Sequence, residues 1–321
     1  MITFLTTAKP FVDASRIHQM NAIRSWKALH PDVEVLLFGD GEGYSAAARE
    51  LGVIHIPGVE TSETGVPRVD RMVAIAAERG RHELRAYVNC DVILMEDLLR
   101  AAARIRRERF LMVARRWNLD VDREIDFSDA GWPTKLRTEV ARRGELFTVW
   151  GIDFLLYRGD VWGDLPPMVV GRAGYDNWLV YRCRANRVPV VDASTVVTAV
   201  HQNHDYGHLH AGRDETFHGP EAQRNAEMAG GSRHLWLISD ADWRLGARRL
   251  ERNWCAGDSR RCAEVFQILR AESPWAGTEA ARRMVAVGCE FCIRLQELRN
   301  LRIAPLLRFP LWASLALAGR R

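Results

Sequence analysis

The chain has 321 residues, 47% of them hydrophobic, which is enough for one large core or for one domain with a smaller extension. Its 45 basic and 41 acidic residues are interspersed and leave a net charge of +4. No continuous basic tract occurs in the first two thirds, so the composition argues against a nucleic-acid-binding protein. The N-terminus lacks the layout of a signal peptide, and no apolar run reaches the roughly 20 residues that span a bilayer. We therefore expect a cytoplasmic protein.

The six cysteines lack the dense spacing of a secreted disulfide scaffold, which also favours a reducing compartment. Cys289 and Cys292 lie three residues apart and could form a zinc site with Cys255 and Cys262. The spacing between the two pairs is irregular, so thiols packed in a core are the better interpretation.

Strand-like and helix-like patterns alternate from the N-terminus. The expected strands are 2–6, 33–38, 53–56 and 85–94, and the expected helices are 15–29, 45–51, 68–79 and 97–103. A strand at 110–114 precedes an irregular stretch at 115–148, which is followed by an uninterrupted strand at 147–157, a helix at 177–185 and extended segments at 188–192 and 194–200. This alternation predicts a mainly parallel sheet covered by helices on both faces.

Ligands of such sheets bind beyond the carboxyl ends of the strands. Five polar residues fall at these ends: Thr6, Thr7, Asp40, Asn89 and Asp91. The chain contains neither a Gly-x-Gly-x-x-Gly motif nor a Gly-x-x-x-x-Gly-Lys-Ser/Thr motif. A bound nucleotide would therefore have to be held in some way other than by a dinucleotide fingerprint or a P-loop.

The segment 85–94 carries the most informative of these polar residues, because Asp91 follows a hydrophobic strand. In a continuous strand Asn89 and Asp91 share a face and offer two oxygen ligands to a divalent cation. A cation held there could carry a substrate diphosphate. The alternative is that Asp91 caps a turn before the helix at 97–103.

Two further carboxylates have aromatic neighbours. Asp153 follows Trp150 in an apolar segment, and it is either a polar anchor in a sugar or nucleotide pocket or a carboxylate paired with an arginine or with backbone. Asp176 lies in Tyr-Asp-Asn-Trp at a helix start, where it is either an N-cap or a general base facing a substrate hydroxyl.

Four of the ten histidines lie within residues 201–210. Histidine together with carboxylate suits manganese or zinc, and a solvated loop is the alternative. With Asp91 more than a hundred residues earlier, His201 and His204 predict a divalent-cation site whose ligands converge in the fold. Arg68 or Arg71 could neutralise donor phosphates, or either could be an ordinary surface charge.

These segments, in this order over residues 1 to about 210, resemble the nucleotide-diphospho-sugar transferases of the GT-A fold and the bacterial and plant glycosyltransferase-like proteins within it. The resemblance rests on Phe-Leu-Thr-Thr at 4–7, Phe-Gly-Asp at 38–40, Tyr-Val-Asn-Cys-Asp-Val-Ile-Leu at 87–94, Trp-Gly-Ile-Asp at 150–153, Tyr-Asp-Asn-Trp at 175–178 and His-Gln-Asn-His-Asp-Tyr at 201–206. It implies a three-layer α/β/α fold with a mainly parallel mixed sheet.

The resemblance also implies roles for individual residues. Thr6, Thr7 and Asp40 would hold the nucleotide, and Asn89-Cys90-Asp91 would stand at the Asp-x-Asp motif that holds the metal and the donor diphosphate, with an Asn in place of the first Asp. His201 or His204 would complete the metal site, and Asp176 would lie where the acceptor base often lies. On this hypothesis Asp176 or Asp153 acts as the catalytic residue that handles the acceptor. The expected activity is glycosyl transfer from a nucleotide sugar to an acceptor hydroxyl, with Mn²⁺ or Mg²⁺ as cofactor.

We expect residues 1–235 to form this catalytic domain and residues 236–321 to form an Arg-rich helical extension. The extension ends in an apolar run at 306–318 that could contact the inner face of a membrane or form a homodimer. Two other functions stay open from the sequence. One is a metal-dependent hydrolase built on His201, His204, Asp205, His208 and His210, and the other is a catalytically degenerate domain that binds a glycan or a partner.

Overall fold

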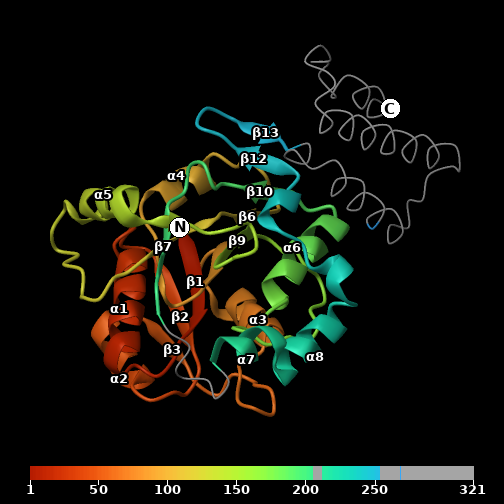
Figure 1. Ribbon diagram of the computed structural model, residues 1–321, viewed down its shortest axis with the longest axis horizontal. Helices are drawn as coiled ribbons and strands as arrows, with labels where there is room; N and C mark the ends of the chain where they lie inside the picture. The colour runs from red at the N-terminus through yellow and green to blue at the C-terminus, as the bar shows by residue number, and fades with distance from the viewer. Residues whose placement is uncertain (205–211, 254–267, 269–321) are drawn as a thin grey trace, which may run out of the picture.

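The computed structural model describes residues 1–204, 212–253 and 268 and places the larger of two sheets at the centre of the molecule (Figure 1). Across this sheet the strand order among the described residues is β13 (Leu250–Arg252), β12 (Trp243–Leu245), β10 (Val190–Asp192), β6 (Phe110–Val113), β9 (Phe154–Arg158), β4 (Leu84–Val88), β1 (Ile2–Thr7), β2 (Glu34–Phe38) and β3 (Ile54–Ile56). Parallel pairings join β3, β2, β1 and β4, and also β6, β10 and β12. β9 lies between these two groups and runs antiparallel to β4 and β6.

Helices cover both faces of the sheet. α1 (Asp13–Lys27), α2 (Tyr44–Leu51) and α4 (Asp97–Ala103) lie on one face, and α3 (Val69–Arg79) and α6 (Tyr175–Ala185) lie on the other (Figure 1). Neighbouring residues of β1 show the two layers, since Phe4 packs in the core beneath α1 and Leu5 packs in the core beneath α3 and α6. This is the alternation of a strand buried on both faces. The predicted three-layer, mainly parallel α/β/α architecture is therefore confirmed.

A second, smaller sheet crosses the edge at which β4 ends. Its strand order is β5 (Val92–Ile93), β11 (Ala199–Gln202), β7 (Arg116–Leu119) and β8 (Glu145–Leu146). α5 (Trp132–Arg143) covers it, with Trp132, Leu136 and Val140 packed against strand residues such as Val200. The sequence predicted an irregular stretch at 115–148, and this was wrong, because β7 and α5 are stabilised by packing onto β11, and β8 by pairing with β7.

Two predicted strands are shorter than expected. The strand at 85–94 ends at Val88, and the chain turns through 89–91 before Val92 joins the other sheet. Asn89 and Asp91 therefore do not share one face of a continuous strand. The strand at 147–157 begins only at Phe154, so Asp153 precedes the strand rather than interrupting it.

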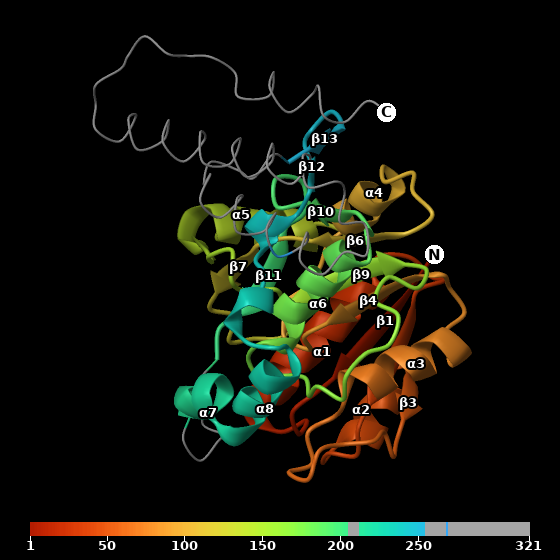
Figure 2. The same cartoon turned by 90° about the vertical axis from the view of Figure 1, so that its right-hand side faces the viewer.

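The last described segments contain α7 (Gly212–His218), α8 (Pro220–Met228), two short 3₁₀ helices at Ser232–His234 and Ile238–Asp240, and the hairpin β12–β13. The start of the extension that was predicted to be helical from residue 236 instead contains the strands β12 and β13, and β12 pairs with β10 and continues the main sheet. Both views place β12 and β13 at the end of the molecule opposite α7 and α8 (Figure 2). The predicted C-terminal helices and the four cysteines of the zinc alternative lie outside the described residues, while Cys90 and Cys183 are buried free thiols. None of the helices in the described ranges has the length and apolarity needed to cross a bilayer.

Candidate metal site

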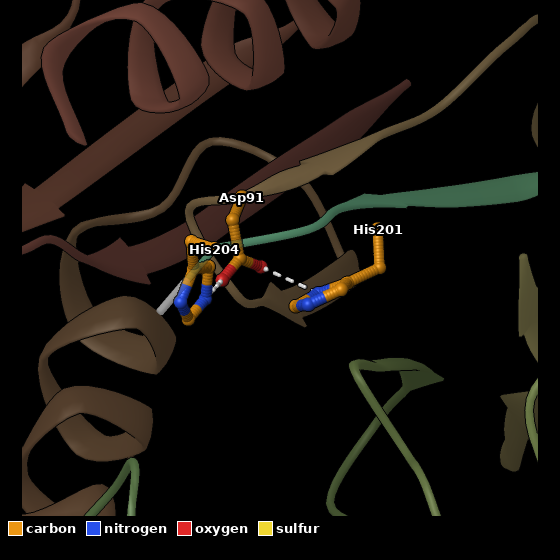
Figure 3. A group of neighbouring side chains, drawn as sticks. All are labelled: Asp91, His201 and His204. Carbon is orange, nitrogen blue, oxygen red and sulfur yellow. Dashed lines mark hydrogen bonds and ion pairs between the residues drawn. The ribbon is translucent and has the colours of Figure 1, made fainter. Parts of the chain in front are cut away.

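Three side chains meet where the two sheets join. The turn after β4 presents Asp91, and β5 then pairs antiparallel with β11 so that Val92 lies opposite His201. His201 Nδ1 lies 3.3 Å from Asp91 Oδ1, and His204, three residues further along, places Nε2 at 3.0 Å from Asp91 Oδ2 (Figure 3). The antiparallel pairing thus brings together residues that are more than a hundred positions apart in sequence.

The geometry of this triad fits a divalent cation. One ligand atom from each of Asp91, His201 and His204 lies within 4.8 Å of the others, and the three side chains are 11–18% exposed. Asp91 Oδ1 and His201 Nδ1 are buried and, within the part of the chain that the structure describes, make no hydrogen bond. A buried polar atom without a hydrogen bond lowers the stability of the folded protein unless a bound group interacts with it. A carboxylate oxygen beside two imidazole nitrogens is a suitable set of ligand atoms for a transition-metal ion.

The imidazoles also control the charge of Asp91. Burial alone would raise the pKa of this carboxyl, but the electrostatic attraction of the His201 imidazole, whose Nδ1 lies 3.3 Å away, and the hydrogen bond with His204 hold the pKa well below its ordinary value. Asp91 is therefore an anion in the folded protein at neutral pH, as a metal ligand must be.

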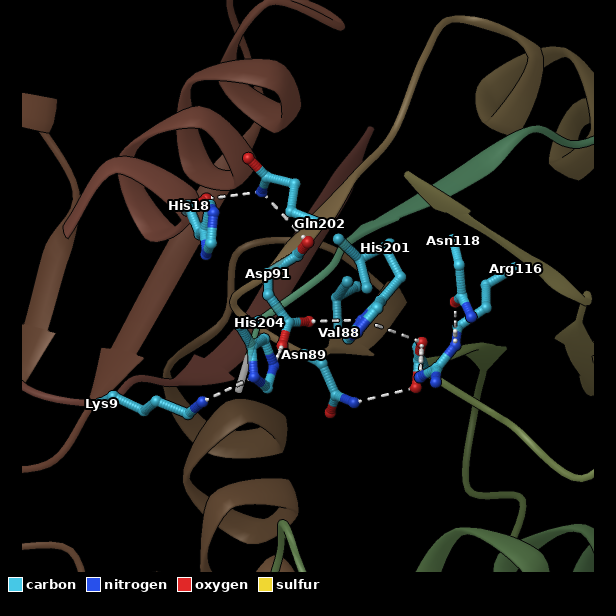
Figure 4. A network of polar contacts seen from close by, with 12 residues as sticks. Lys9, His18, Val88, Asn89, Asp91, Arg116, Asn118, His201, Gln202 and His204 are labelled. Carbon is cyan, nitrogen blue, oxygen red and sulfur yellow. Dashed lines mark hydrogen bonds and ion pairs between the residues drawn. The ribbon is translucent and has the colours of Figure 1, made fainter. Parts of the chain in front are cut away.

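A buried amide that the sequence interpretation did not single out supports the triad. Gln202 is fully buried on β11 and donates hydrogen bonds to the backbone oxygens of His18, at 2.7 Å, and Asp91, at 3.1 Å (Figure 4). Its side-chain oxygen accepts from Asn21 Nδ2 at 3.0 Å. Trp26 donates to the oxygen of Val92 at 2.9 Å. Helix α1 therefore fixes the backbone next to Asp91 and next to His201.

Next to the triad lies a second polar group centred on Asp153. The Asp153 carboxylate is 4% exposed and pairs with Arg116, whose Nη1 lies 2.5 Å from Oδ2. Asn89 donates to Asp153 Oδ1 at 3.1 Å, and His201 Nδ1 lies 3.6 Å from Oδ2. Arg116 also stacks on the ring of Phe147, at 4.3 Å. The amide of Asn89 is thus directed at Asp153, and the charge of Asp153 is balanced by a guanidinium.

Asp176 occupies the first turn of α6, immediately after Tyr175. Gly174 is the N-cap, with a φ of 102° that suits glycine, so the N-cap interpretation of Asp176 was wrong by two positions. The hydroxyl of Tyr175 lies 3.5 Å from Asn89 Oδ1, which places the start of α6 beside the Asn89–Asp153 pair. Burial, with a further contribution from the negative charge of Asp153, raises the pKa of Asp176 to about 7. A carboxyl with such a pKa is suited to proton transfer near neutral pH.

The predicted nucleotide-binding residues lie at the carboxyl ends of neighbouring strands. Thr6 is fully buried and donates to the oxygen of Val88 at 2.7 Å, so its hydroxyl joins β1 to β4. Thr7 Oγ1 lies 3.4 Å from the hydroxyl of Tyr44. Asp40 is exposed and accepts from the backbone N–H of Gly58 at 2.7 Å.

The two arginines proposed for donor phosphates are both engaged with acidic neighbours. Arg71 is 46% exposed and lies 2.9 Å from Glu60, and Arg68 pairs with Glu60 and Asp70. Of the predicted histidine cluster, the structure describes His201 and His204, while Asp205, His208 and His210 lie outside the described residues. Three residues missed from the sequence, Lys9, Arg116 and Gln202, contact the triad or its neighbours. Their only sequence signal was their place beside a strand end.

Comparisons with known proteins find no matching family model and no matching curated protein. A search of solved structures finds glucosyl-3-phosphoglycerate synthase from Mycobacterium tuberculosis in complex with Mg²⁺ and uridine diphosphate, at 13% identity and a TM-score of 0.42, covering 72% of this chain and 80% of that one. The same enzyme with Mn²⁺ and UDP-glucose aligns at 12% identity, the same coverage and a TM-score of 0.42. S. aureus TarS 1–349 with UDP aligns over 39% of this chain and 38% of that one, at 14% identity and a TM-score of 0.28. These likenesses are low in identity and in TM-score, so the chemistry of this chain rests on the residues of its own site.

Proposed function

We propose that this protein is a metal-dependent glycosyltransferase that moves a sugar from a nucleotide-diphosphate donor to an acceptor hydroxyl. The observation that carries the proposal is the triad of Asp91, His201 and His204, with its orphaned buried atoms, at the carboxyl edge of a mainly parallel sheet. That edge is where such sheets bind their ligands. A carboxyl with a pKa of about 7 at the start of α6 adds a group able to accept a proton.

The three triad residues would hold Mn²⁺ or Mg²⁺. Two imidazoles among the ligands favour Mn²⁺, because Mg²⁺ prefers oxygen ligands and bound water. A bound divalent cation supplies electrostatic stabilisation of the diphosphate leaving group. Gln202 and Trp26 keep the ligand backbone in place before any cation arrives.

Asp176 is the proposed general base for the acceptor hydroxyl. Its raised pKa matches the proton affinity that this step needs near neutral pH, and Tyr175 and Asn89 link its helix start to the site. Asp153 was an alternative catalytic residue. Because Arg116 balances its charge and Asn89 binds its other oxygen, we assign Asp153 to the orientation of His201 and Asn89. Base catalysis on the acceptor by Asp176 would accompany direct displacement and inversion at the sugar.

The donor nucleotide would lie along the ends of β1 and β2. Thr7 and the exposed carboxylate of Asp40 lie at these ends, and the buried Thr6 joins β1 to β4 through its hydrogen bond to Val88 O. The indole of Trp150 is 57% exposed close to Asp153 in sequence, and it offers an apolar face for an acceptor glycan. Arg71 would have to leave Glu60 to reach a phosphate.

The assay is calorimetric titration of UDP and of GDP into metal-free protein, with and without Mn²⁺. We expect one nucleotide to bind only with Mn²⁺, and we expect Asp91→Ala to abolish this binding. Asp120→Ala is the matched control, because Asp120 accepts a hydrogen bond from Asn203 close to His204 but lies outside the triad. If neither nucleotide binds wild-type protein with Mn²⁺, or if Asp120→Ala has the same effect as Asp91→Ala, the proposal fails. Transfer to water or to a panel of glycans then separates a hydrolase from a transferase.

A further inference from the structure

Lys9 directs its ammonium at the metal triad. Its Nζ lies 3.2 Å from His204 Nδ1, on the side of the ring opposite the nitrogen that faces Asp91 (Figure 4). No feature of the sequence had marked this lysine, which lies just beyond the end of β1. We propose that Lys9 is a positioning residue for the donor diphosphate. A cation on the triad would end the contact between Lys9 and His204, and the Lys9 ammonium would then bind the diphosphate. The inference rests on the proposed function.

The backbone around Lys9 is fixed on both sides. Gln19, which is 3% exposed on α1, accepts from Lys9 N–H at 2.6 Å and donates to Lys9 O at 3.1 Å. One residue earlier, the backbone N–H of Ala8 donates to the Tyr44 hydroxyl at 2.8 Å, and that hydroxyl donates back to Ala8 O. A surface lysine needs no such support. These hydrogen bonds from Gln19 and Tyr44 hold the backbone of residues 8 and 9, so only the side chain of Lys9 can change its position.

The hydrogen bonds define the proton position on His204. An ammonium group only donates, so Nδ1 accepts from Lys9 and the ring proton lies on Nε2, which donates to Asp91. When Nε2 instead gives its lone pair to a cation, the neutral ring carries its proton on Nδ1. Lys9 and Nδ1–H would then both be donors, so they could no longer hydrogen-bond to each other, and the ammonium could donate to a phosphate oxygen beside the triad.

The charges show which acceptor fits. The triad contributes one carboxylate, because position 89 is an asparagine, and the charge of Asp153 is already balanced by Arg116. A divalent cation on the triad would leave a net charge of about +1, while the diphosphate of a nucleotide sugar carries roughly two negative charges. Lys9 supplies the missing positive charge at the carboxyl end of β1. A charge-assisted bond from ammonium to phosphate is among the stronger polar contacts in proteins.

The proposal predicts opposite changes in two affinities, which a residue with a merely structural role would not produce. In Lys9→Met, the affinity for Mn²⁺ alone should rise about 3- to 10-fold, because a competing cation has been removed. The affinity of the Mn²⁺-loaded protein for the nucleotide that binds wild type should fall about 10- to 100-fold. Lys9→Arg should retain most of the nucleotide affinity. Lys27→Met is the matched control, since Lys27 Nζ contacts Gly52 O, and it should change neither value.

Both affinities are measured by calorimetry, and Mn²⁺ binding is also measured by electron paramagnetic resonance. Thermal melts of each variant verify folding. Parallel losses of Mn²⁺ and nucleotide affinity in Lys9→Met would overturn the inference and make Lys9 a support of the triad. An unchanged nucleotide affinity would overturn it as well. If wild-type protein with Mn²⁺ binds neither UDP nor GDP, it is the proposed function that fails, and this result is distinct from a failure of Lys9→Met alone.

Discussion

Asn89→Asp would restore the Asp-x-Asp motif, and the structure predicts that this change damages the protein. The new carboxylate would take the place of an amide that donates to Asp153 Oδ1 at 3.1 Å. Two like charges at that distance repel by about 5 kcal/mol at an effective dielectric constant of about 20. Loss of the amide hydrogen bond adds about 1 kcal/mol, and Arg116, which pairs with Asp153, offsets part of the total. We expect a net destabilisation of about 2–4 kcal/mol at neutral pH.

The assay is urea unfolding of metal-free protein at two pH values. Repulsion from Asp153 would raise the pKa of the new carboxyl in the folded state. The loss in the free energy of unfolding should therefore be complete above that pKa and should diminish toward pH 4, where the carboxyl is protonated. Asn118→Asp is the matched control, because Asn118 Oδ1 accepts from Arg116 Nε at 3.1 Å and an added charge there faces a guanidinium. It should be neutral or stabilising.

The reasoning would be refuted by an Asn89→Asp variant that is as stable as wild type and binds Mn²⁺ more tightly. Both results together would place side chain 89 at the cation rather than at Asp153. A loss of stability with unchanged m-value is the expected pattern.

The remaining predictions concern the base, the supporting amide and the exposed indole. Wild-type kcat/KM should fall about tenfold per pH unit below about pH 7, and Asp176→Asn should lower kcat by about 100-fold or more. The raised pKa of Asp176 costs stability above its unfolded pKa, so Asp176→Asn should gain about 1–2 kcal/mol in urea unfolding at pH 8 and nothing near pH 4. Gln202→Leu removes the two hydrogen bonds that the side chain donates to backbone oxygens and the one that it accepts from Asn21, so it should lose about 2–4 kcal/mol in the same assay, and equal stability would contradict the role given to this amide. Trp150→Ala should change stability by less than about 0.5 kcal/mol while raising the KM for acceptor and not for donor in steady-state kinetics.

The sequence predicted the sheet well because each of its early strands is a continuous apolar run followed by a helix with one apolar face. It predicted the smaller sheet poorly. β5 and β8 have two residues each, and they form by pairing with β11 and with β7, respectively. The periodicity of a short segment carries no record of a partner that lies a hundred residues away.

The grouping of Asp91, His201 and His204 could be predicted because they are chemically distinctive residue types at segment ends. The orientation of Asn89 could not be predicted, because it depends on the turn that ends β4 and on Arg116 holding Asp153. Lys9 and Gln19 were missed for a similar reason. A lysine becomes notable only when a buried amide clamps its backbone beside a histidine.

The antiparallel pairing of β5 with β11 has a consequence for the order in which the protein is made. β1 to β4 and their helices can pack before His201 leaves the ribosome, but the triad requires the contact between Asp91 and His204, which are separated by 113 residues. Contacts of such separation form late, because the loop that they close is long. A cation bound by the triad would link β11, which forms late, to the N-terminal half of the chain. Protein with a bound cation should therefore resist proteolysis near β11 more than metal-free protein does. The nascent chain, by contrast, cannot assemble the triad from its first half.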